Sequence, residues 1–350
     1  MSESSSLDRE TEVEFLRGLV ERYSPSGKEE PARDYLVRRL PELGYSVEVD
    51  DAGNVIARTG GRGPEVLLTS HMDTVRGQVP VRRDGDVLYG RGSVDAKGPL
   101  ASMCLAGARV PDANVTVVGV VEEEVSGRGA RHLVDTYPEP DYLVNGEPSG
   151  SDTVTLGYRG ILRLRYRVTG DVIHTARPGV NAIEDVVDFW TDVSGLEDDG
   201  DGFDCLSTKP TELDSDSDGF RLDCEIRGGI RIPPERSVSG VREAVEEIAD
   251  GRDGEVVFGE STEPVVVDRS NAVARAFVRS IRDVGMEPGL SVKTGTSDMN
   301  VYSEEWSCPM VTYGPGDSSL DHTPDEHIEL KDYGRAIDVL ERVVEDLGDD

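Results

Sequence analysis

His71 and Asp73, two residues apart, are a pair of side chains whose types and spacing suit metal chemistry. They lie in the stretch 65–75, where an apolar run of strand length reaches His71 and a loop is expected to follow. In such a pair the imidazole can bind a metal ion while the carboxylate orients the ring. A lone histidine is more often a hydrogen-bonded surface or core residue, so this interpretation depends on other groups joining it.

Acidic residues follow other predicted strands in the same way. Two further apolar runs lead into the glutamates 122–124 and into Glu147, and the loop 90–95 ends in Asp95. Because ligand groups gather at the carboxyl ends of strands in open α/β sheets, these carboxylates are expected to converge near His71.

The candidate metal ligands are two imidazoles and three carboxylates, namely His71, Asp95, Glu124, Glu147 and His322. Nitrogen and oxygen donors of this kind suit Zn²⁺, with Co²⁺ or Mn²⁺ as substitutes. Five donors exceed what one open tetrahedral site needs, but they suit two metals bridged by one carboxylate, ~3.5–4 Å apart, for attack on a carbonyl. A remaining acidic residue could then move the proton of the water to a leaving amine.

The charge of the chain is extreme, since 37 basic residues face 70 acidic ones and the net charge is −33. Lysine is nearly absent, because it occurs only at five positions, 28, 97, 209, 293 and 331. This composition is typical of proteins that work in molar salt, where the Debye length falls to ~3 Å. A polyanion that mimics nucleic acid or is disordered is the alternative, but the acidic residues alternate with periodic segments. Binding to nucleic acid is not expected, because the phosphates would be repelled.

The cysteines and the amino terminus indicate a cytoplasmic protein. No Cys-x-x-Cys spacing occurs among the four cysteines, Cys104, Cys205, Cys224 and Cys308. The polar, acidic start of the chain does not resemble a signal peptide, and no apolar run approaches membrane-spanning length. We therefore expect neither export nor a membrane association.

The elements that would position these groups alternate between helices and strands. Helices are predicted at 7–23, 28–43, 98–110 and 129–137, and strands at 46–49, 55–58, 65–71, 115–121 and 142–145. This alternation favours an α/β fold with a mainly parallel sheet covered by helices.

The residue pattern changes after residue 157. Apolar and basic residues alternate at 161–168, as in a strand with one solvent-exposed face. A helix from about Asn181, a glycine- and aspartate-rich stretch at 197–219, a strand near 220–226 and a helix at 238–249 follow. We expect a small α+β domain at 158–262, inserted into a catalytic domain made of 1–157 and 263–350. The later segments 265–267, 271–284, 310–313 and 331–347 would return to the catalytic domain.

Five separated motifs, in order along nearly the whole chain, resemble those of the M20 metallopeptidase family, which includes acetylornithine deacetylase and succinyl-diaminopimelate desuccinylase. The motifs are 71–75, 90–98, 122–124, 146–148 and 314–324. The resemblance implies a dizinc-peptidase-like catalytic domain with an inserted lid and dimerisation domain.

The resemblance also implies a role for each candidate ligand. One zinc would be held by His71, Asp95 and Glu147, and the other by Asp95, Glu124 and His322, so that Asp95 bridges them. Asp73 would hydrogen-bond the far nitrogen of His71.

Glu123 would be the general base. The family usually has Asp-Glu-Glu at 122–124, and three identical residues leave open a shift in which Glu122 is the base and Glu123 a ligand.

The segment 174–182 resembles the part of the family's lid whose histidine reaches the neighbouring active site of a homodimer and stabilises the oxyanion. His174 would play that role here. Arg177 and Asn181 are candidate substrate contacts, and helix capping or surface pairing is an equally good interpretation of both.

The segment 293–300 resembles the family's loop beside the substrate, which makes Lys293 and Ser297 candidate substrate contacts; a surface charge is the alternative for Lys293. Together with 147–150, 156–160 and 313–325, it looks most like the branch that releases lysine or ornithine from the C-terminal glutamate of a LysW-type amino-group carrier protein. That release completes lysine or arginine biosynthesis.

Two other functions stay open at this stage. A deacylase of free N-acetyl-ornithine or N-acetyl-lysine, or a small dipeptidase, would use the same site. A non-catalytic binding module on the same fold is the alternative outside the enzymes, although all five ligands and the base are present in the sequence.

Overall fold

The computed structural model describes residues 8–174 and 176–348, and in it the chain forms two compact units. Unit 1 consists of the chain up to Gly157, Val267–Ser291 and the chain from Ser297, and unit 2 consists of Tyr158–Val266 and Val292–Thr296. The insertion expected at 158–262 therefore lies within unit 2. Its role as a lid and dimerisation domain remains a prediction.

Unit 1 is built around a mixed sheet with the strand order β1-β2-β6-β3-β7-β15-β8. The short strands β13 (Val265–Val266) and β14 (Gly289–Lys293) stand where the chain passes between the units. A small antiparallel sheet has the order β16-β5-β4. The other strand bounds are β1 (Ser46–Val49), β2 (Val55–Arg58), β3 (Arg62–His71), β4 (Arg82–Asp84), β5 (Val87–Tyr89), β6 (Ala113–Val120), β7 (Tyr142–Gly146), β8 (Thr153–Tyr158), β15 (Met310–Thr312) and β16 (His327–Glu329).

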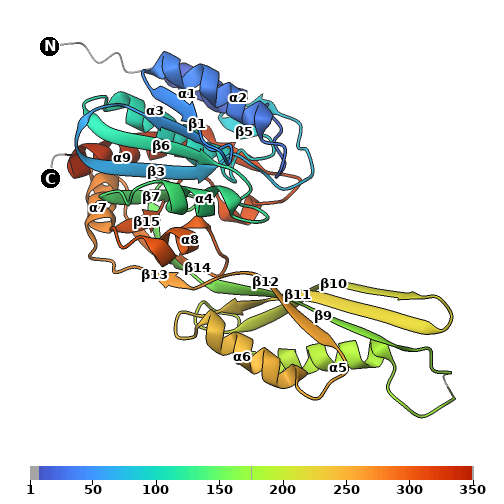
Figure 1. The fold of residues 1–350 in the computed structure, drawn as a ribbon. Helices are drawn as coiled ribbons and strands as arrows, with labels where there is room; N and C mark the ends of the chain where they lie inside the picture. Colours follow the sequence, from blue (N-terminus) through green and yellow to red (C-terminus); the bar gives the residue numbers. More distant parts are fainter. Residues whose placement is uncertain (1–7, 175, 349–350) are drawn as a thin grey trace. The chain divides into compact units, whose positions relative to one another are not determined.

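Helices cover both faces of this sheet (Figure 1). They are α1 (Arg9–Val20), α2 (Glu30–Arg39), α3 (Lys97–Arg109), α4 (Arg128–Thr136), α7 (Ala272–Asp283), α8 (Asp298–Glu305) and α9 (Leu330–Gly348), with 3₁₀ turns η1 (Leu40–Leu43) and η2 (Ser318–Leu320). The side chains of β3 alternate between the two helical layers. Leu68 packs in the main core, which α3, α7 and α9 share, whereas Thr69 on the other face hydrogen-bonds Tyr302 of α8 (3.0 Å between the hydroxyl oxygens).

The three central strands end at the same edge of the sheet, which is what brings the candidate ligands together. β3 pairs in parallel with β6 and β7, so that His71 lies opposite Val120, and Ser70 lies opposite Gly146. The chain continues from these ends directly into the glutamates 122–124 and into Glu147.

Unit 2 is an antiparallel sheet with the order β10-β11-β9-β12 and two helices on one face. Its elements are β9 (Gly160–Asp171), α5 (Ala182–Ser194), β10 (Ser207–Ser217), β11 (Arg221–Ile232), α6 (Val238–Ala249) and β12 (Glu255–Thr262). Leu162, Leu164 and Tyr166 of β9 face the helices and form a core separate from that of unit 1.

The expected α/β class with a mainly parallel central sheet is confirmed, and most predicted segments are found with ends shifted by a few residues. The stretch 197–219 is a correction, because it contains the strand β10. β10 is an edge strand whose residues after Thr208 are exposed, so it needs no apolar alternation and is held by its pairing with β11. The strand β12 was also missed.

Candidate metal centre

The Asp95 carboxylate lies between two imidazoles at the edge of the sheet. His71 Nε2 is 3.0 Å from Asp95 Oδ1, and His322 Nε2 is 3.0 Å from Asp95 Oδ2. His71 ends β3, Asp95 ends the loop between β5 and α3, and His322 follows η2. Each carboxylate oxygen thus faces the Nε2 atom of a different histidine, which is the arrangement expected of the predicted bridging ligand.

Glu124 joins this group from the loop after β6. His322 Nε2 is 3.1 Å from each of its carboxylate oxygens. His71, Asp95 and Glu124 each offer a ligand atom, and these atoms lie within 4.8 Å of one another. Four of the five predicted ligands therefore meet around Asp95.

Asp73 holds the glutamate loop in addition to touching His71. Its Oδ1 accepts a hydrogen bond from the Glu123 amide (3.1 Å), and its Oδ2 accepts from the Glu124 amide (3.3 Å) and the Ser26 hydroxyl (2.7 Å). His71 Nδ1 is nearer to the main-chain carbonyl of Asp73 (2.9 Å) than to its carboxylate (3.5 Å). The predicted Asp73–His71 contact is present, but the main-chain oxygen is the nearer acceptor.

The three consecutive glutamates have different surroundings. Glu122 has a left-handed backbone (φ 59°), and its carboxylate accepts hydrogen bonds from Ser126 (2.8 Å) and Arg128 (2.9 Å). Glu124 contacts His322 as described above. Glu123 lies between them in sequence, and burial, followed by the nearby charge of Glu147, raises its pKa well above the ordinary value. This geometry favours the register with Glu124 as the ligand over the shifted one.

Glu147 acts on the same groups through its charge. It follows β7, and its carboxylate contributes to raising the pKa values of both His71 and Glu123. Its place as a ligand rests on this proximity and on the sequence motif.

The donor set fits divalent metal ions. Hydrogen bonds that His322 donates to Asp95 and then to Glu124 raise the pKa of His322 to about 10, so that in the absence of a cation the imidazole itself carries the positive charge that balances the carboxylates. Two imidazole nitrogens and three carboxylates are the ligands that zinc and its substitutes accept, and metal binding would displace these protons.

A buried ion pair that the sequence analysis did not predict joins two ligand loops. Glu326 Oε1 accepts hydrogen bonds from the amides of Val94 (3.0 Å) and Asp95 (3.2 Å), and Arg91 Nη1 donates to Glu326 Oε2 (2.6 Å). Arg91 Nη2 also donates to the carbonyl of Thr323 (3.1 Å). The loop of Asp95 and the loop of His322 are thereby tied to each other.

Two further ionisable groups near the centre were also missed. Lys97 is fully buried and donates to the carbonyl of Arg22 (2.7 Å), and burial lowers its pKa to about 7. Asp298, the first residue of α8, is buried, and burial raises its pKa to about 7 although His71 opposes the shift. Both lie inside motifs identified in the sequence, but only their burial distinguishes them from surface charges.

The predicted substrate contacts differ in their local roles. His174 is exposed on a loop of unit 2, where its Nδ1 accepts a hydrogen bond from the Ala176 amide (3.2 Å), and Arg177 is exposed on the same loop. Asn181 caps α5 by accepting from the amides of Ile183 (2.9 Å) and Glu184, which supports the capping interpretation.

The two predicted substrate contacts in the 293–297 segment also differ in their local roles. Ser297, in unit 1, caps α8 by accepting from the Met299 amide (3.2 Å), and Asn300 completes a capping box. Lys293, in unit 2, is partly buried at the end of β14.

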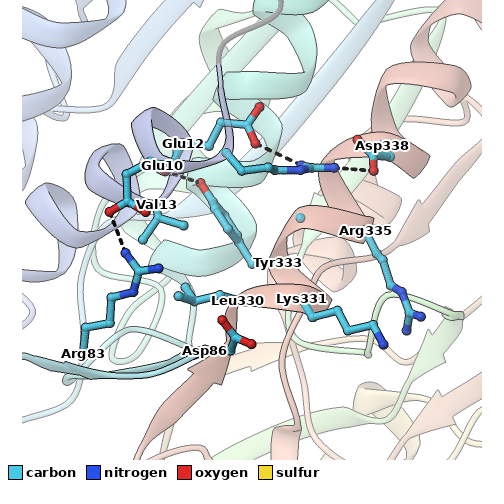
Figure 2. Close-up of a pocket in the computed structure, with 12 residues that line it drawn as sticks. Glu10, Glu12, Val13, Arg83, Asp86, Leu330, Lys331, Tyr333, Arg335 and Asp338 are labelled. Carbon is cyan, nitrogen blue, oxygen red and sulfur yellow. Dashed lines mark hydrogen bonds and ion pairs between the residues drawn. The ribbon is translucent and has the colours of Figure 1, made fainter.

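The cavity drawn in Figure 2 is not at the metal centre. It has a volume of about 380 Å³ and lies between α1 and α9, and none of the five candidate ligands is among the residues that line it. An ion pair between Arg83 and Glu10 (2.6 Å) stands at its rim. Its charges are largely paired with one another, so we assign it no role.

Comparison with known proteins places these observations in a family. The profile of peptidase family M20/M25/M40 matches residues 67–346. A Deinococcus radiodurans protein named LysW-lysine hydrolase is 39% identical over 348 residues, covering 95% of this chain and 96% of that protein. A Sulfurisphaera tokodaii protein named LysW-lysine/LysW-ornithine hydrolase is 31% identical and covers 97% of both chains.

Solved structures share the fold at low sequence identity. A tripeptidase from Staphylococcus aureus superposes with a TM-score of 0.82 at 20% identity over 99% of this chain and 100% of that one. A Bacillus subtilis protein described as a dinuclear metal binding peptidase of the M20 family has a TM-score of 0.69 at 15% identity, covering 96% and 97%. Within residues 8–174 and 176–348, no helix is both long and apolar enough to cross a membrane.

Proposed function

The chain belongs to peptidase family M20/M25/M40 and is a metal-dependent amide hydrolase, and we propose that it releases lysine or ornithine from the C-terminal glutamate of an amino-group carrier protein. The observation that carries the proposal is the Asp95 carboxylate between His71 and His322. Relatives named LysW-lysine hydrolase and LysW-lysine/LysW-ornithine hydrolase, which match almost the whole chain, support it. The biosynthesis of lysine, of arginine, or of both would end with this step.

The residues divide between two metal positions. His71, Asp95 and Glu147 would hold one ion, and Asp95, Glu124 and His322 the other. Zn²⁺ suits this set, and Co²⁺ or Mn²⁺ could replace it. When bound, two such ions polarise an amide carbonyl and make a water molecule acidic.

Glu123 is the group proposed to move the proton. Its pKa, raised by burial and by the charge of Glu147, suits a carboxylate that takes a proton from the attacking water and later gives it up. The water oxygen forms a bond to the amide carbon, the carbon–nitrogen bond breaks, and the proton passes through Glu123 to the leaving amine. Asp73 positions Glu123 by accepting from its amide.

His174 is proposed to act in the active site of a second copy of the chain in a homodimer. There its imidazole would donate a hydrogen bond to the oxyanion that forms on the substrate. Its exposed position on a loop of unit 2 leaves the ring available to another chain. Arg177 and Lys293 are proposed to contact the substrate, whereas Asn181 and Ser297 have capping roles that compete with such a contact.

A cytoplasmic, salt-adapted setting is part of the proposal. The four cysteines are free, as expected in a reducing compartment. The net charge of −33 is consistent with high intracellular salt.

Hydrolysis by the metal-loaded protein in concentrated potassium chloride tests the substrate. The carrier protein charged with lysine or ornithine should release the amino acid, and free N-acetyl-lysine and N-acetyl-ornithine should not react. Release only from the free compounds would instead establish a small-molecule deacylase, and no release from any of them, with two metals bound, would remove the substrate claim.

A further inference from the structure

One face of the unit 2 sheet is open and unusually basic for this chain. Side chains of β9 alternate between the helix-covered face, where Leu164 and Tyr166 are buried, and the opposite face, where Arg163, Arg165 and Arg167 are exposed. The open face therefore begins with three arginines on one strand.

Strand register adds basic residues at one end of this face. Arg165 lies directly opposite Arg227 of β11. Gly229 of β11 lies between Arg163 of β9 and Lys209 of β10, which flank it on its two sides. Arg231, two residues after Gly229, points to the same face of the sheet. We call this set the basic half-face, and it consists of Arg163, Arg165, Lys209, Arg227 and Arg231. The other half carries carboxylates, namely Asp171, Asp214, Asp216, Asp223 and Glu225.

Two arginines of the basic half-face have no partner in the part of the chain that the structure describes. Among the residues that the structure describes, Arg163 and Arg165 form no ion pair or side-chain hydrogen bond, whereas Arg167 pairs with Asp223 (2.6 Å) and Arg227 with Glu212 (2.9 Å). Glu260 stands on the β12 bulge near Arg163 in register, yet it does not pair with it. The chain has 70 acidic and 37 basic residues. With such an excess of carboxylates, each arginine would be expected to have an ion-pair partner, and two neighbouring arginines without one are unexpected.

The arrangement also works against the stability of the sheet. Like charges directly opposite one another on antiparallel strands are destabilising, and Arg165 faces Arg227 in this way. Glu212 and Glu225 offset the charge of Arg227, whereas Arg163 and Arg165 gain no ion pair from the described residues, which points to an anionic partner outside the chain.

The basic half-face borders the segment that the sequence places beside the substrate. Arg231 Nη1 donates to the Thr296 hydroxyl (3.1 Å), and Arg159 Nε donates to the Thr294 carbonyl (2.8 Å), both within unit 2. An anionic chain lying along the half-face would thus lead to the segment that contains Lys293.

We propose that the basic half-face binds an acidic polypeptide segment of the carrier protein, close to the C-terminal glutamate that holds the amino acid. The inference rests on the proposed function for the identity of the partner, and on charge complementarity for its chemistry. Guanidinium groups suit this task, because they bind carboxylates bidentately. At molar salt the Debye length is ~3 Å, so only such direct contacts retain their strength.

The kinetic test compares a double variant, Arg163→Glu with Arg165→Glu, with the wild-type protein on two substrates. We expect the KM for the carrier protein loaded with lysine or ornithine to rise by about tenfold or more. Reversing the charge of the contact surface would repel an acidic partner. The kcat should stay unchanged, and so should kcat/KM for a small glutamyl-lysine amide that lacks the carrier. Arg221→Glu is the matched control, since it reverses one charge on the distal, acidic half of the same sheet.

A binding measurement keeps the test independent of turnover. A fluorescein-labelled oligoglutamate peptide, followed by anisotropy across a potassium chloride series, should bind the wild type more tightly than the double variant. Wild-type KM values and equal peptide binding in the double variant would overturn the proposal, and so would an equal loss on both substrates. Tighter binding of single-stranded DNA than of the peptide would replace the acidic polypeptide with a nucleic acid. A protein that binds the peptide through these arginines but releases nothing from the carrier would refute the proposed function alone.

Discussion

Arg91 and Glu326 form a buried ion pair (2.6 Å) between two loops that each carry a candidate metal ligand. Glu326 also accepts from the Asp95 amide, and Arg91 also reaches the Thr323 carbonyl beside His322. Mutation of a group that hydrogen-bonds and orients a metal ligand typically lowers metal affinity by about 10–100-fold. The pair therefore sets the spacing between the bridging carboxylate and one of its histidines.

Replacing Glu326 with Gln should weaken metal binding by roughly 10–100-fold, because a neutral amide leaves Arg91 without its charge partner and can no longer receive all three donors. Calorimetric titration of the metal-free protein with Zn²⁺ measures this effect directly. Glu329→Gln, at an exposed residue nearby, is the matched control and should bind zinc as the wild type does. Wild-type affinity in Glu326→Gln would show that the pair supports the fold only.

Replacing Glu123 with Gln should lower kcat by roughly 10²–10⁴-fold, the usual contribution of a positioned acid or base, while two metals stay bound. Metal content by atomic emission and turnover under saturating substrate separate the two effects. Glu122→Gln provides the comparison, because the Glu122 carboxylate already bonds Ser126 and Arg128 and should matter little to turnover. If Glu122→Gln were the inactive protein and Glu123→Gln the active one, the base would be Glu122.

Much of the centre could be predicted because its signals are local. A strand that ends in His71, two strands that end before glutamates, and an α/β alternation together require a common edge, and the parallel register of β3, β6 and β7 provides it. The motif around His322 is equally local, although it joins Asp95 from a distant part of the chain.

The remaining features depend on burial and pairing, which a single sequence does not encode in short patterns. The sequence around Glu326 predicts a surface carboxylate in a polar loop, whereas in the structure Glu326 is fully buried and paired with Arg91. The strand β10 was missed for the opposite reason, since an exposed edge strand needs no apolar alternation. The three glutamates 122–124 could be told apart only by the directions in which their side chains turn.

Tyr166 should make the stability of unit 2 sensitive to alkaline pH. It is buried, stacks on Phe189 (3.9 Å between ring centroids) and bonds Asp185, and burial followed by the Asp185 charge raises its pKa to about 12. A tyrosine in the unfolded chain titrates near 10, so stability is unaffected below about pH 10 and is lost as the pH rises from 10 toward 12. Unfolding midpoints of the wild type and Tyr166→Phe, followed by circular dichroism over this range, should show a shallower fall in the variant. Parallel curves would exclude a contribution from Tyr166.

The proposed action of His174 on a second copy of the chain can be tested by complementation. His174→Ala should lower turnover by roughly 10²–10³-fold, as the loss of one oxyanion donor does, without changing metal content. Glu123→Gln should be inactive for a different reason, because its own site lacks the base. Neither homodimer then contains a complete site.

Mixing the two variants after dissociation in denaturant should restore about a quarter of wild-type activity, because half of the random dimers are mixed and each mixed dimer completes one site of two. That site would combine Glu123 of the His174→Ala chain with His174 of the Glu123→Gln chain. Mixing His174→Ala with wild-type protein, and each variant refolded alone, are the controls for recovery. No activity above the separate variants would place His174 in the site of its own chain, and loss of both metals in His174→Ala would make it a ligand instead.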